Sequence, residues 1–511
     1  MVGREAAAEG FLAWLGGLAA PGAVAALLDH GLRFVDIDAP GFAPEDAALA
    51  GLAPGFGALL GQGYGAYAAA HRAALLARRP GLEPVPTGRM LDVAYTLAAR
   101  AKLVLCPFSG EWVETGASLG TEAYWHGVDG RAVLVCQFSE PIFPNFDTVW
   151  VLPDQGLVLF ASSQVPNHYV RYLLGELLGS LAAAPGQAAT ILQRGAAAAT
   201  GLVELNAPHF GHYVWNNVSA LGGLLGPGAL APDFHVSRPG ACFFAPVTEL
   251  LPELSRQPQF QVGLEPEMLA LAAEQQAVLA FGKDMEISSA IAGRVLGWAT
   301  RTCPPAGLAM LRQLRAAPGP LVLLGLRLGN RAWLEQAEGL VALAEALAAR
   351  PGGASFVLDG MVGGLPMGWT HQLMSLDAEM ALAAQVMAGI RRFAPCESVV
   401  GASMAESLVA CDLCDIFVAP GGSGLARYKW LANKPGVLLS NRVALDHTHP
   451  EGWGVRAFEH HREGGIPSRF IAPEAVRDVP AEEREGLIHA NFSLDWRVVA
   501  VAAEEVLAGL G

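Results

Sequence analysis

Residues 415–429 read DIFVAPGGSGLARYK, and the expected class of fold follows from this stretch. An apolar run typical of a buried strand passes into a glycine-rich turn, and a helical pattern begins directly after it. Glycine lets the backbone approach a ligand closely, and the first N–H groups of a helix carry partial positive charge. The stretch therefore predicts an α/β fold with a phosphate site at the carboxyl end of a strand. The residues expected to bind the phosphate are Gly421, Gly422, Ser423, Gly424 and Arg427.

The sequence on either side of this loop alternates between strands and helices. Predicted strands lie at 321–326, 355–358, 398–400, 415–419 and 436–440, with helices at 333–349, 378–393, 404–410 and 425–431. This spacing predicts a parallel sheet with right-handed crossovers. The glycine loop can also be a turn that serves packing alone. It is not a P-loop, because no Gly-Lys-Ser/Thr sequence closes it.

Two arginines follow the first strand of this C-terminal region. Arg327 and Arg331 come just after strand 321–326, on the sheet edge where the glycine loop is expected. Guanidinium groups suit a diphosphate and stabilise charge on a departing nucleotide. Either arginine can equally be an ordinary surface residue, but their position beside the loop favours a role in binding.

Two further motifs offer candidate site residues. Ser403 and Glu406 have the spacing of a helix capping box, which explains both residues structurally, and Glu406 can also contact a nucleoside. His209 and His212 lie where an earlier strand, 201–205, meets a helix. A neutral histidine there is a candidate general base for an acceptor hydroxyl. The alternative is a hydrogen-bonded structural histidine.

Five segments are expected along the chain. They are a helical extension over 1–100, a β-rich meander over 101–187, an α/β lobe over 188–315, a Rossmann-like lobe over 316–490 and a final helix over 491–511. Residues 11–28 carry no charge, but preceding glutamates and internal Gly and Pro argue against a signal peptide or membrane span. We read them as two short helical pieces.

Composition excludes several classes of function. Of the 511 residues, 52% are hydrophobic and the formal charge is −15, so nucleic acid and anionic membranes are repelled. Seven scattered cysteines fit reduced thiols in the cytosol. Cys411 and Cys414 form a single CxxC that fits buried small hydrophobes better than a redox motif. We therefore expect a cytoplasmic protein with no integral membrane segment and no nucleic-acid partner.

The order of these motifs resembles the glycosyltransferase family of plant xylosyltransferases and the extracellular O-linked N-acetylglucosamine transferase. The resemblance covers about 202–440 and rests on His212-Tyr213 with Asn216, on Arg327 and Arg331, on 405–407 and on 419–425. The loop histidine of that family is replaced by Gly421 or Gly422, and an acidic residue by Asn216. The resemblance implies a GT-B fold of two Rossmann-like lobes, with the donor on the C-terminal lobe and the acceptor on the earlier one.

The expected activity is transfer of a sugar from a nucleotide-sugar donor to a glycan, lipid or protein acceptor. The resemblance implies inversion and no metal or other cofactor. Two rival hypotheses remain open. One is a metal-dependent hydrolase that uses His209, His212, His447 and His449. The other is a non-catalytic protein that binds a nucleotide or sugar. The first 200 residues can recognise the acceptor or mediate formation of a homodimer.

Overall fold

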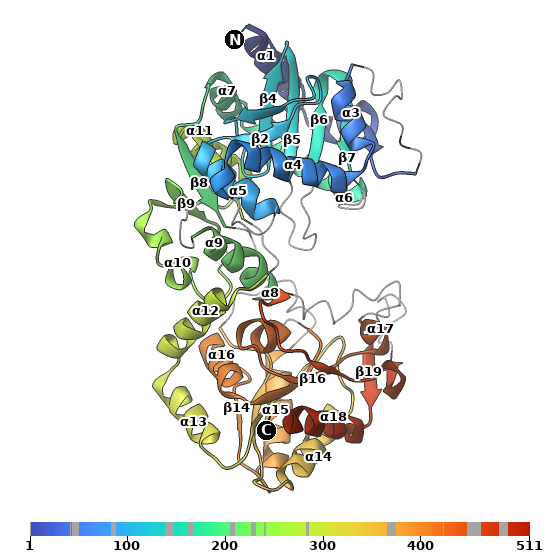
Figure 1. Ribbon diagram of the computed structural model, residues 1–511, viewed down its shortest axis with the longest axis vertical. Coiled ribbons are helices and arrows are strands. Elements are labelled where there is room, and N and C mark those ends of the chain that lie inside the picture. Colours follow the sequence, from blue (N-terminus) through green and yellow to red (C-terminus); the bar gives the residue numbers. More distant parts are fainter. Residues whose placement is uncertain are drawn as a thin grey trace. The chain divides into compact units, whose positions relative to one another are not determined.

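The computed structural model divides the chain into two compact units (Figure 1). Unit 1 consists of Met1–Asn206, Ala220–Ala241 and Pro252–Asp284, and unit 2 of Ala207–Ser219, Cys242–Leu251 and Met285–Gly511. The structure describes residues 2–40, 42, 51–82, 88–137, 148–161, 167–204, 210–225, 231–239, 242–282, 286–364, 375–422, 424–446, 461–479 and 489–510.

Unit 1 begins with helices, and a meander of strands follows them. Its strands are β1 (Arg33–Asp36), β2 (Lys102–Leu105), β3 (Trp112–Thr115), β4 (Ala123–Val128), β5 (Arg131–Gln137), β6 (Thr148–Leu152), β7 (Leu157–Phe160), β8 (Ala199–Val203), β9 (Phe234–Ser237), β10 (Gln259–Gln261) and β11 (Ala277–Phe281). Its helices include α1 (Val2–Gly17), α2 (Ala23–Ala26), α3 (Pro54–Leu60), α4 (Tyr64–Arg78), α5 (Gly88–Ala99), α6 (Asn167–Ala183), α7 (Pro185–Gln193), α9 (Ser219–Leu224) and α11 (Glu265–Glu274), with shorter turns η1 (Leu27–Gly31), η3 (Pro80–Leu82), η4 (Pro153–Gln155) and η6 (Leu254–Arg256).

The meander is a five-stranded sheet in the order β1-β7-β6-β5-β4. Strands β4 to β7 pair antiparallel, and β1 pairs parallel to β7. Both faces are buried: Leu134 packs in the core formed with α1 and α6, whereas its neighbour Val135 packs in the core formed with α3 and α4. Because successive side chains of a strand point to opposite faces, burial of both faces explains why these strands read as continuous apolar runs.

A second sheet of unit 1 contains four parallel strands in the order β10-β9-β8-β11. The chain therefore adds β9 and β10 on one side of β8 and then places β11 on the other side. This is a doubly wound arrangement, and it agrees with the α/β class predicted for the earlier region.

Unit 2 is built on a six-stranded parallel sheet in the order β14-β13-β12-β15-β16-β17. Its strands are β12 (Leu321–Gly325), β13 (Ser355–Asp359), β14 (Cys396–Ser398), β15 (Ile416–Pro420), β16 (Gly436–Leu439), β17 (Arg469–Phe470) and the separate antiparallel pair β18 (Val476–Val479) and β19 (Asn491–Leu494). Its helices include α8 (Phe210–His212), η5 (Tyr213–Val218), α10 (Val247–Leu250), α12 (Ser289–Thr302), α13 (Pro305–Arg315), α14 (Gln336–Ala348), α15 (Leu376–Ile390), α16 (Met404–Leu413), η8 (Ala426–Leu431), α17 (Arg442–Leu445), η10 (Pro473–Ala475) and α18 (Trp496–Ala508).

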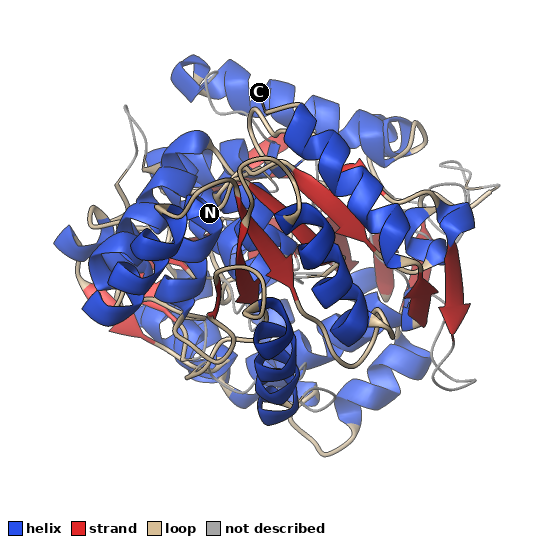
Figure 2. Cartoon of the chain, turned by 90° about the horizontal axis from the view of Figure 1, so that it is seen from below, coloured by secondary structure: helices blue, strands red, loops and turns tan. Residues whose placement is uncertain are grey.

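Helices cover both faces of this sheet (Figure 2). Helices α14, α15 and α18 pack on one face, where Val322, Leu324 and Val418 lie in their core. Helices α12 and α13 pack on α16, which with η8 covers the other face. Burial on both faces accounts for the apolar strands between the helices. The predicted α/β class, with parallel sheets, is confirmed.

The two compact units do not follow the five segments expected from sequence. Residues of α12 and α13, expected in the earlier lobe, belong to unit 2 because these helices pack on α16. The short segments around α8 and α10 also belong to unit 2. Among the described helices, none has the length and apolar character needed to cross a bilayer. All seven cysteines are free thiols, and Cys411 and Cys414 are buried, as expected for small core residues.

Candidate functional site

The carboxyl edge of the unit 2 sheet contains a topological switch point. From β12 the chain passes through α14 to β13 and then through α15 to β14, and both strands lie on one side of β12. Helix α16 then leads to β15 on the other side of β12. Counted along the chain, the strand order is third, second, first, fourth, fifth, sixth. In open sheets of this order, ligands bind outside the carboxyl ends of the strands where the order reverses. That point lies between the ends of β12 and β15.

Arg327 and the glycine loop meet at this point. Arg327 follows β12, and Gly422 follows β15. The Arg327 guanidinium donates from Nε to the Asn330 carbonyl (2.6 Å) and from Nη2 to Asn330 Oδ1 (2.6 Å). Its Nη1 lies against Gly422, where an added Cβ would collide with it. Glycine at 422 therefore allows this close approach of the Arg327 guanidinium, whereas the approach of a ligand to the loop stays a prediction.

Arg331 occupies a backbone conformation that is rare for a residue with a side chain. Its φ is +55°, in the left-handed region, and its N–H donates to the His489 carbonyl (3.2 Å). Its Nε is buried and has no hydrogen-bond partner among the described residues. Strain and an unsatisfied donor at one residue are features that concentrate at functional sites.

These two arginines lack a direct counter-ion within the described part of the chain. No carboxylate lies within ion-pair distance of Arg327 or Arg331 there. Burial and the neighbouring Arg331 lower the pKa of Arg327 to about 9, although Glu379 acts to raise it. Burial also lowers the pKa of Arg331. Both side chains are still cationic at neutral pH, so this edge favours a bound anion.

Part of the loop backbone forms hydrogen bonds with the sheet. The N–H of Gly421 donates to the Leu439 carbonyl (2.6 Å), which removes it from the expected phosphate contacts. The N–H groups of Gly422 and Gly424 donate to no described residue. The following helix is η8, a π-helix of six residues, rather than the expected α-helix. A single short turn supplies little dipole, so the arginines provide most of the positive charge.

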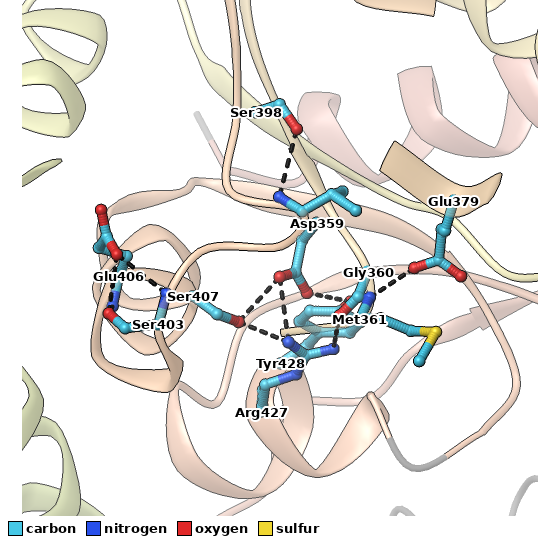
Figure 3. Close-up of polar contacts among 11 residues, drawn as sticks. Asp359, Gly360, Met361, Glu379, Ser398, Ser403, Glu406, Ser407, Arg427 and Tyr428 are labelled. Atoms are coloured by element: carbon cyan, nitrogen blue, oxygen red, sulfur yellow. Dashed lines mark hydrogen bonds and ion pairs between the residues drawn. The ribbon is translucent and has the colours of Figure 1, made fainter. Parts of the chain in front are cut away.

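Arg427, another expected binding residue, is engaged in a buried network below this edge (Figure 3). Its guanidinium donates to Asp359 Oδ1 (3.0 Å), Ser407 Oγ (2.5 Å) and the Gly360 carbonyl (2.9 Å). The Tyr428 hydroxyl donates to the other carboxylate oxygen of Asp359 (2.5 Å). The network ties β13 to α16 and η8, which gives Arg427 a structural role. Its role in binding a donor stays a prediction.

Asp359 ends β13, where a carboxylate could bind a ribose hydroxyl. It is fully buried, and both of its oxygens accept from the Arg427 network. Because the carboxylate is fully buried, it is not placed to bind a ribose hydroxyl. In the sequence, nothing local links Asp359 to its partner Arg427, which lies 68 residues away.

Glu406 and Ser403 form the predicted capping box at the start of α16. Ser403 Oγ accepts from the Glu406 N–H (3.3 Å), and Glu406 Oε2 accepts from the Ser403 N–H (2.9 Å) and hydroxyl (2.7 Å). The other carboxylate oxygen lies against Gly307 of α13. These contacts explain Glu406 structurally, and its contact with a nucleoside stays a prediction.

His212 lies at the end of α8 in unit 2. Its Nδ1 is 2.8 Å from Asn216 Oδ1, and its ring stacks on Trp215, with ring centres 5.8 Å apart. Trp215 also contacts His461, with ring centres 4.3 Å apart. His209, Ser423, His447 and His449 lie outside the described residues. Among the residues that are described, none form a group that could hold a metal ion.

Glu379 is a buried residue of this edge that the sequence analysis missed. It lies in the first turn of α15 with 1% of its surface exposed, and it accepts from the Met361 N–H after β13 (Figure 3). Burial raises the pKa of Glu379, although the hydrogen bond from the Met361 N–H acts to lower it. In the sequence, Glu379 is one of several acidic residues at a helix start, so no local signal marks it.

Comparisons with known proteins give a distant structural likeness. No protein-family model matches the chain, and no curated protein matches it. A glycosyl transferase family 9 protein from Veillonella parvula DSM 2008 is similar in structure, with a TM-score of 0.34 and 9% identity over 62% of this chain and 99% of that one. The comparisons do not support the specific family that the motifs resemble. A likeness this low also assigns no activity.

Proposed function

We propose that this chain is a glycosyltransferase that uses a nucleotide-sugar donor. The observation that carries the proposal is that Arg327 meets Gly422 at the switch point and has Arg331 as a neighbouring charge, and that neither arginine has a carboxylate partner in the described chain. A donor diphosphate would supply the missing negative charge. It would also accept from the Gly422 and Gly424 N–H groups, which have no described partner.

The proposed reaction is a single displacement at the sugar. An acceptor oxygen forms a bond to the anomeric carbon while the bond from that carbon to the diphosphate oxygen breaks. The electron pair of the broken bond goes to the leaving diphosphate, where the arginines stabilise the charge as it develops. The acceptor proton passes to a base, and the configuration of the anomeric carbon inverts.

His212 is the base that we propose, with His209 as the alternative. Asn216 Oδ1 can only accept a hydrogen bond, so its contact with His212 Nδ1 (2.8 Å) places the ring proton on Nδ1. The basic lone pair is then on Nε2. This is the tautomer that a general base needs. The acceptor can be a glycan, lipid or protein, and the first 200 residues are proposed to recognise it or to form a homodimer.

Calorimetric binding of UDP, GDP, CMP and ADP compounds tests this proposal. Wild type should bind one of them, and Arg327→Ala should lose about 1.5–3 kcal/mol of binding free energy, the range for a charged hydrogen bond. Arg392→Ala is the matched control, because this exposed arginine precedes β14 at the opposite edge of the sheet. Absence of binding to every compound would sink the proposal. Binding without release of free nucleotide in the presence of acceptors would favour a non-catalytic protein.

A further inference from the structure

A surface groove of about 430 Å³ lies where the first turn of α14 meets the end of β19 and the start of α18. Helices α14 and α18 pack against each other beside it (Figure 1). Pockets that bind small ligands span roughly 300–1,000 Å³, so the groove has room for a side chain or a small molecule. Neither Arg327 nor Arg331 lines it, and it is therefore separate from the proposed donor site.

The floor of this groove is apolar. The indole of Trp333 packs on α14 at Gly339, where an added Cβ would collide with the ring, and its Nε1 donates to the Leu494 carbonyl at the end of β19 (3.0 Å). Ala342, one turn further along α14, and the half-buried Trp496 of α18 complete the apolar lining. Such a floor can cover the aliphatic part of a long side chain, which releases water from both surfaces.

Three carboxylates stand around the floor, and they differ in their partners. Glu335 accepts from Ser493 Oγ (2.5 Å), and Asp495 accepts from the N–H of Arg497 at the start of α18 (2.9 Å). Glu338 is exposed in the first turn of α14, and among the described residues it has no hydrogen-bond or ion-pair partner. The rim therefore carries negative charge, and one of its carboxylates is available to a cation that enters the groove.

Arg497, next to the groove, shows which kind of cation suits this rim. Its guanidinium lies over the Trp496 ring, with Cζ 4.9 Å from the ring centre, and its Nη1 is 3.3 Å from Asp495 Oδ1. A guanidinium is planar and weakly hydrated, so it can stack on an indole while it pairs with a carboxylate, whereas an ammonium is a strongly hydrated point charge. A second guanidinium inside the groove would meet the same two groups, an indole and a carboxylate.

We propose that this groove binds an arginine side chain that another protein presents. The guanidinium stacks on Trp496 and donates to Glu338, and its aliphatic stem lies on Trp333 and Ala342. The negative rim repels an acidic segment, so charge selects a basic one.

Exposed apolar side chains beside the groove favour a protein over a free small cation. Leu334 lies between two lining residues and is 50% exposed, and Val498, in the first turn of α18, is 37% exposed. A small cation leaves both side chains in water, whereas a polypeptide can cover them. Exposed apolar groups mark protein interaction sites, and arginine is enriched in protein interfaces. The occupant is therefore an arginine-containing segment with apolar neighbours.

Titration with a capped peptide of sequence Gly-Leu-Arg-Leu-Gly, followed by nuclear magnetic resonance, tests the proposal. The indole N–H signal of Trp496, assigned from its loss in Trp496→Phe, should shift as the peptide binds. A peptide with citrulline in place of arginine has the same shape without the charge, and it should bind roughly tenfold more weakly. Glu338→Gln should bind the arginine peptide roughly threefold more weakly, as expected for loss of one exposed charge pair. Glu345→Gln makes the same charge change on α14 outside the groove and should match wild type.

Ala342→Met provides an independent test, because it fills the groove without changing a charge. It should weaken binding of the arginine peptide at least as much as Glu338→Gln does. Ala346→Met adds the same side chain one turn further along α14, outside the lining, and should bind as wild type does.

Three results would overturn the proposal. They are an unmoved Trp496 signal, equal binding of the citrulline peptide, and wild-type affinity in both Glu338→Gln and Ala342→Met. Self-association of wild type that Ala342→Met abolishes would contradict it too, because the groove would then belong to a contact with a second copy of this chain. No nucleotide enters these measurements, so their outcome is independent of the proposed function.

Discussion

Three arginines near the glycine loop differ in what surrounds their guanidinium groups. Arg427 is paired with Asp359 and donates to two further oxygens. Among the described residues, the Arg327 guanidinium donates only to Asn330, and the buried Nε of Arg331 has no partner. A cation that is already paired with a buried carboxylate gains little binding free energy from a phosphate. A cation without a carboxylate partner gains much more. Binding should therefore depend on Arg327 and Arg331.

Arg331→Gly should make the protein more stable and its anion site weaker. Glycine adopts the positive φ of this position without strain, so we expect the free energy of unfolding to rise by on the order of 1 kcal/mol. Loss of the guanidinium should lower the affinity for pyrophosphate. Denaturant unfolding and calorimetry measure the two effects. Arg331→Lys, which keeps both charge and strain, should not gain stability. A less stable Arg331→Gly protein with unchanged affinity would contradict this reading of the residue.

At the scale of elements, the carboxyl edge is held together by two buried carboxylates with different partners. Asp359 joins β13 to α16 and η8 through Ser407, Arg427 and Tyr428. Glu379 joins α15 to the loop after β13 through the Met361 N–H. Each connection replaces water around a buried charge with hydrogen-bond donors, which is the condition for keeping that charge in a core. The strand ends are thereby fixed relative to one another.

Arg427→Met should destabilise the protein strongly. It leaves the buried carboxylate of Asp359 without its cation, and breaking a buried pair in this way costs about 3–5 kcal/mol. The control is Arg469→Met, because Arg469 pairs with Glu505 while more than half of each side chain is exposed. Such surface pairs contribute about 0–1 kcal/mol. Denaturant unfolding of both variants measures the difference, and equal losses would show that the buried network does not hold these elements together.

At the scale of the whole molecule, the two doubly wound sheets differ in the charges at their carboxyl edges. In unit 1, Glu204 after β8 lies 3.2 Å from His235, and Arg238 after β9 is paired with Glu265 at 2.5 Å. In unit 2, Arg327 and Arg331 have no such partner among the described residues. With a formal charge of −15 on the chain, anions are repelled from most of the surface. The anion site should therefore be confined to unit 2.

Hydrogen exchange with and without pyrophosphate tests this confinement. Bound anion should slow exchange in the unit 2 segments 324–331 and 420–424, because it stabilises the conformation that binds it. Segments 202–204 and 236–239, at the matching edge of unit 1, should exchange at the same rate in both conditions. Equal slowing at both edges would mean that pyrophosphate binds wherever a strand ends, without selecting the unpaired arginines.

The sequence alone predicted the features that depend on local pattern. The parallel sheet of unit 2 follows from apolar runs and helical spacing, and the capping box at Ser403 follows from a spacing of three residues. Only the tertiary structure showed that Arg427 is paired with a buried carboxylate whereas Arg327 is not. The pairing depends on Asp359, which lies far from both arginines in the chain. The tertiary structure also decided the place of Glu379, since the Met361 N–H that donates to this carboxylate follows β13, and only the folded sheet brings that loop to the start of α15.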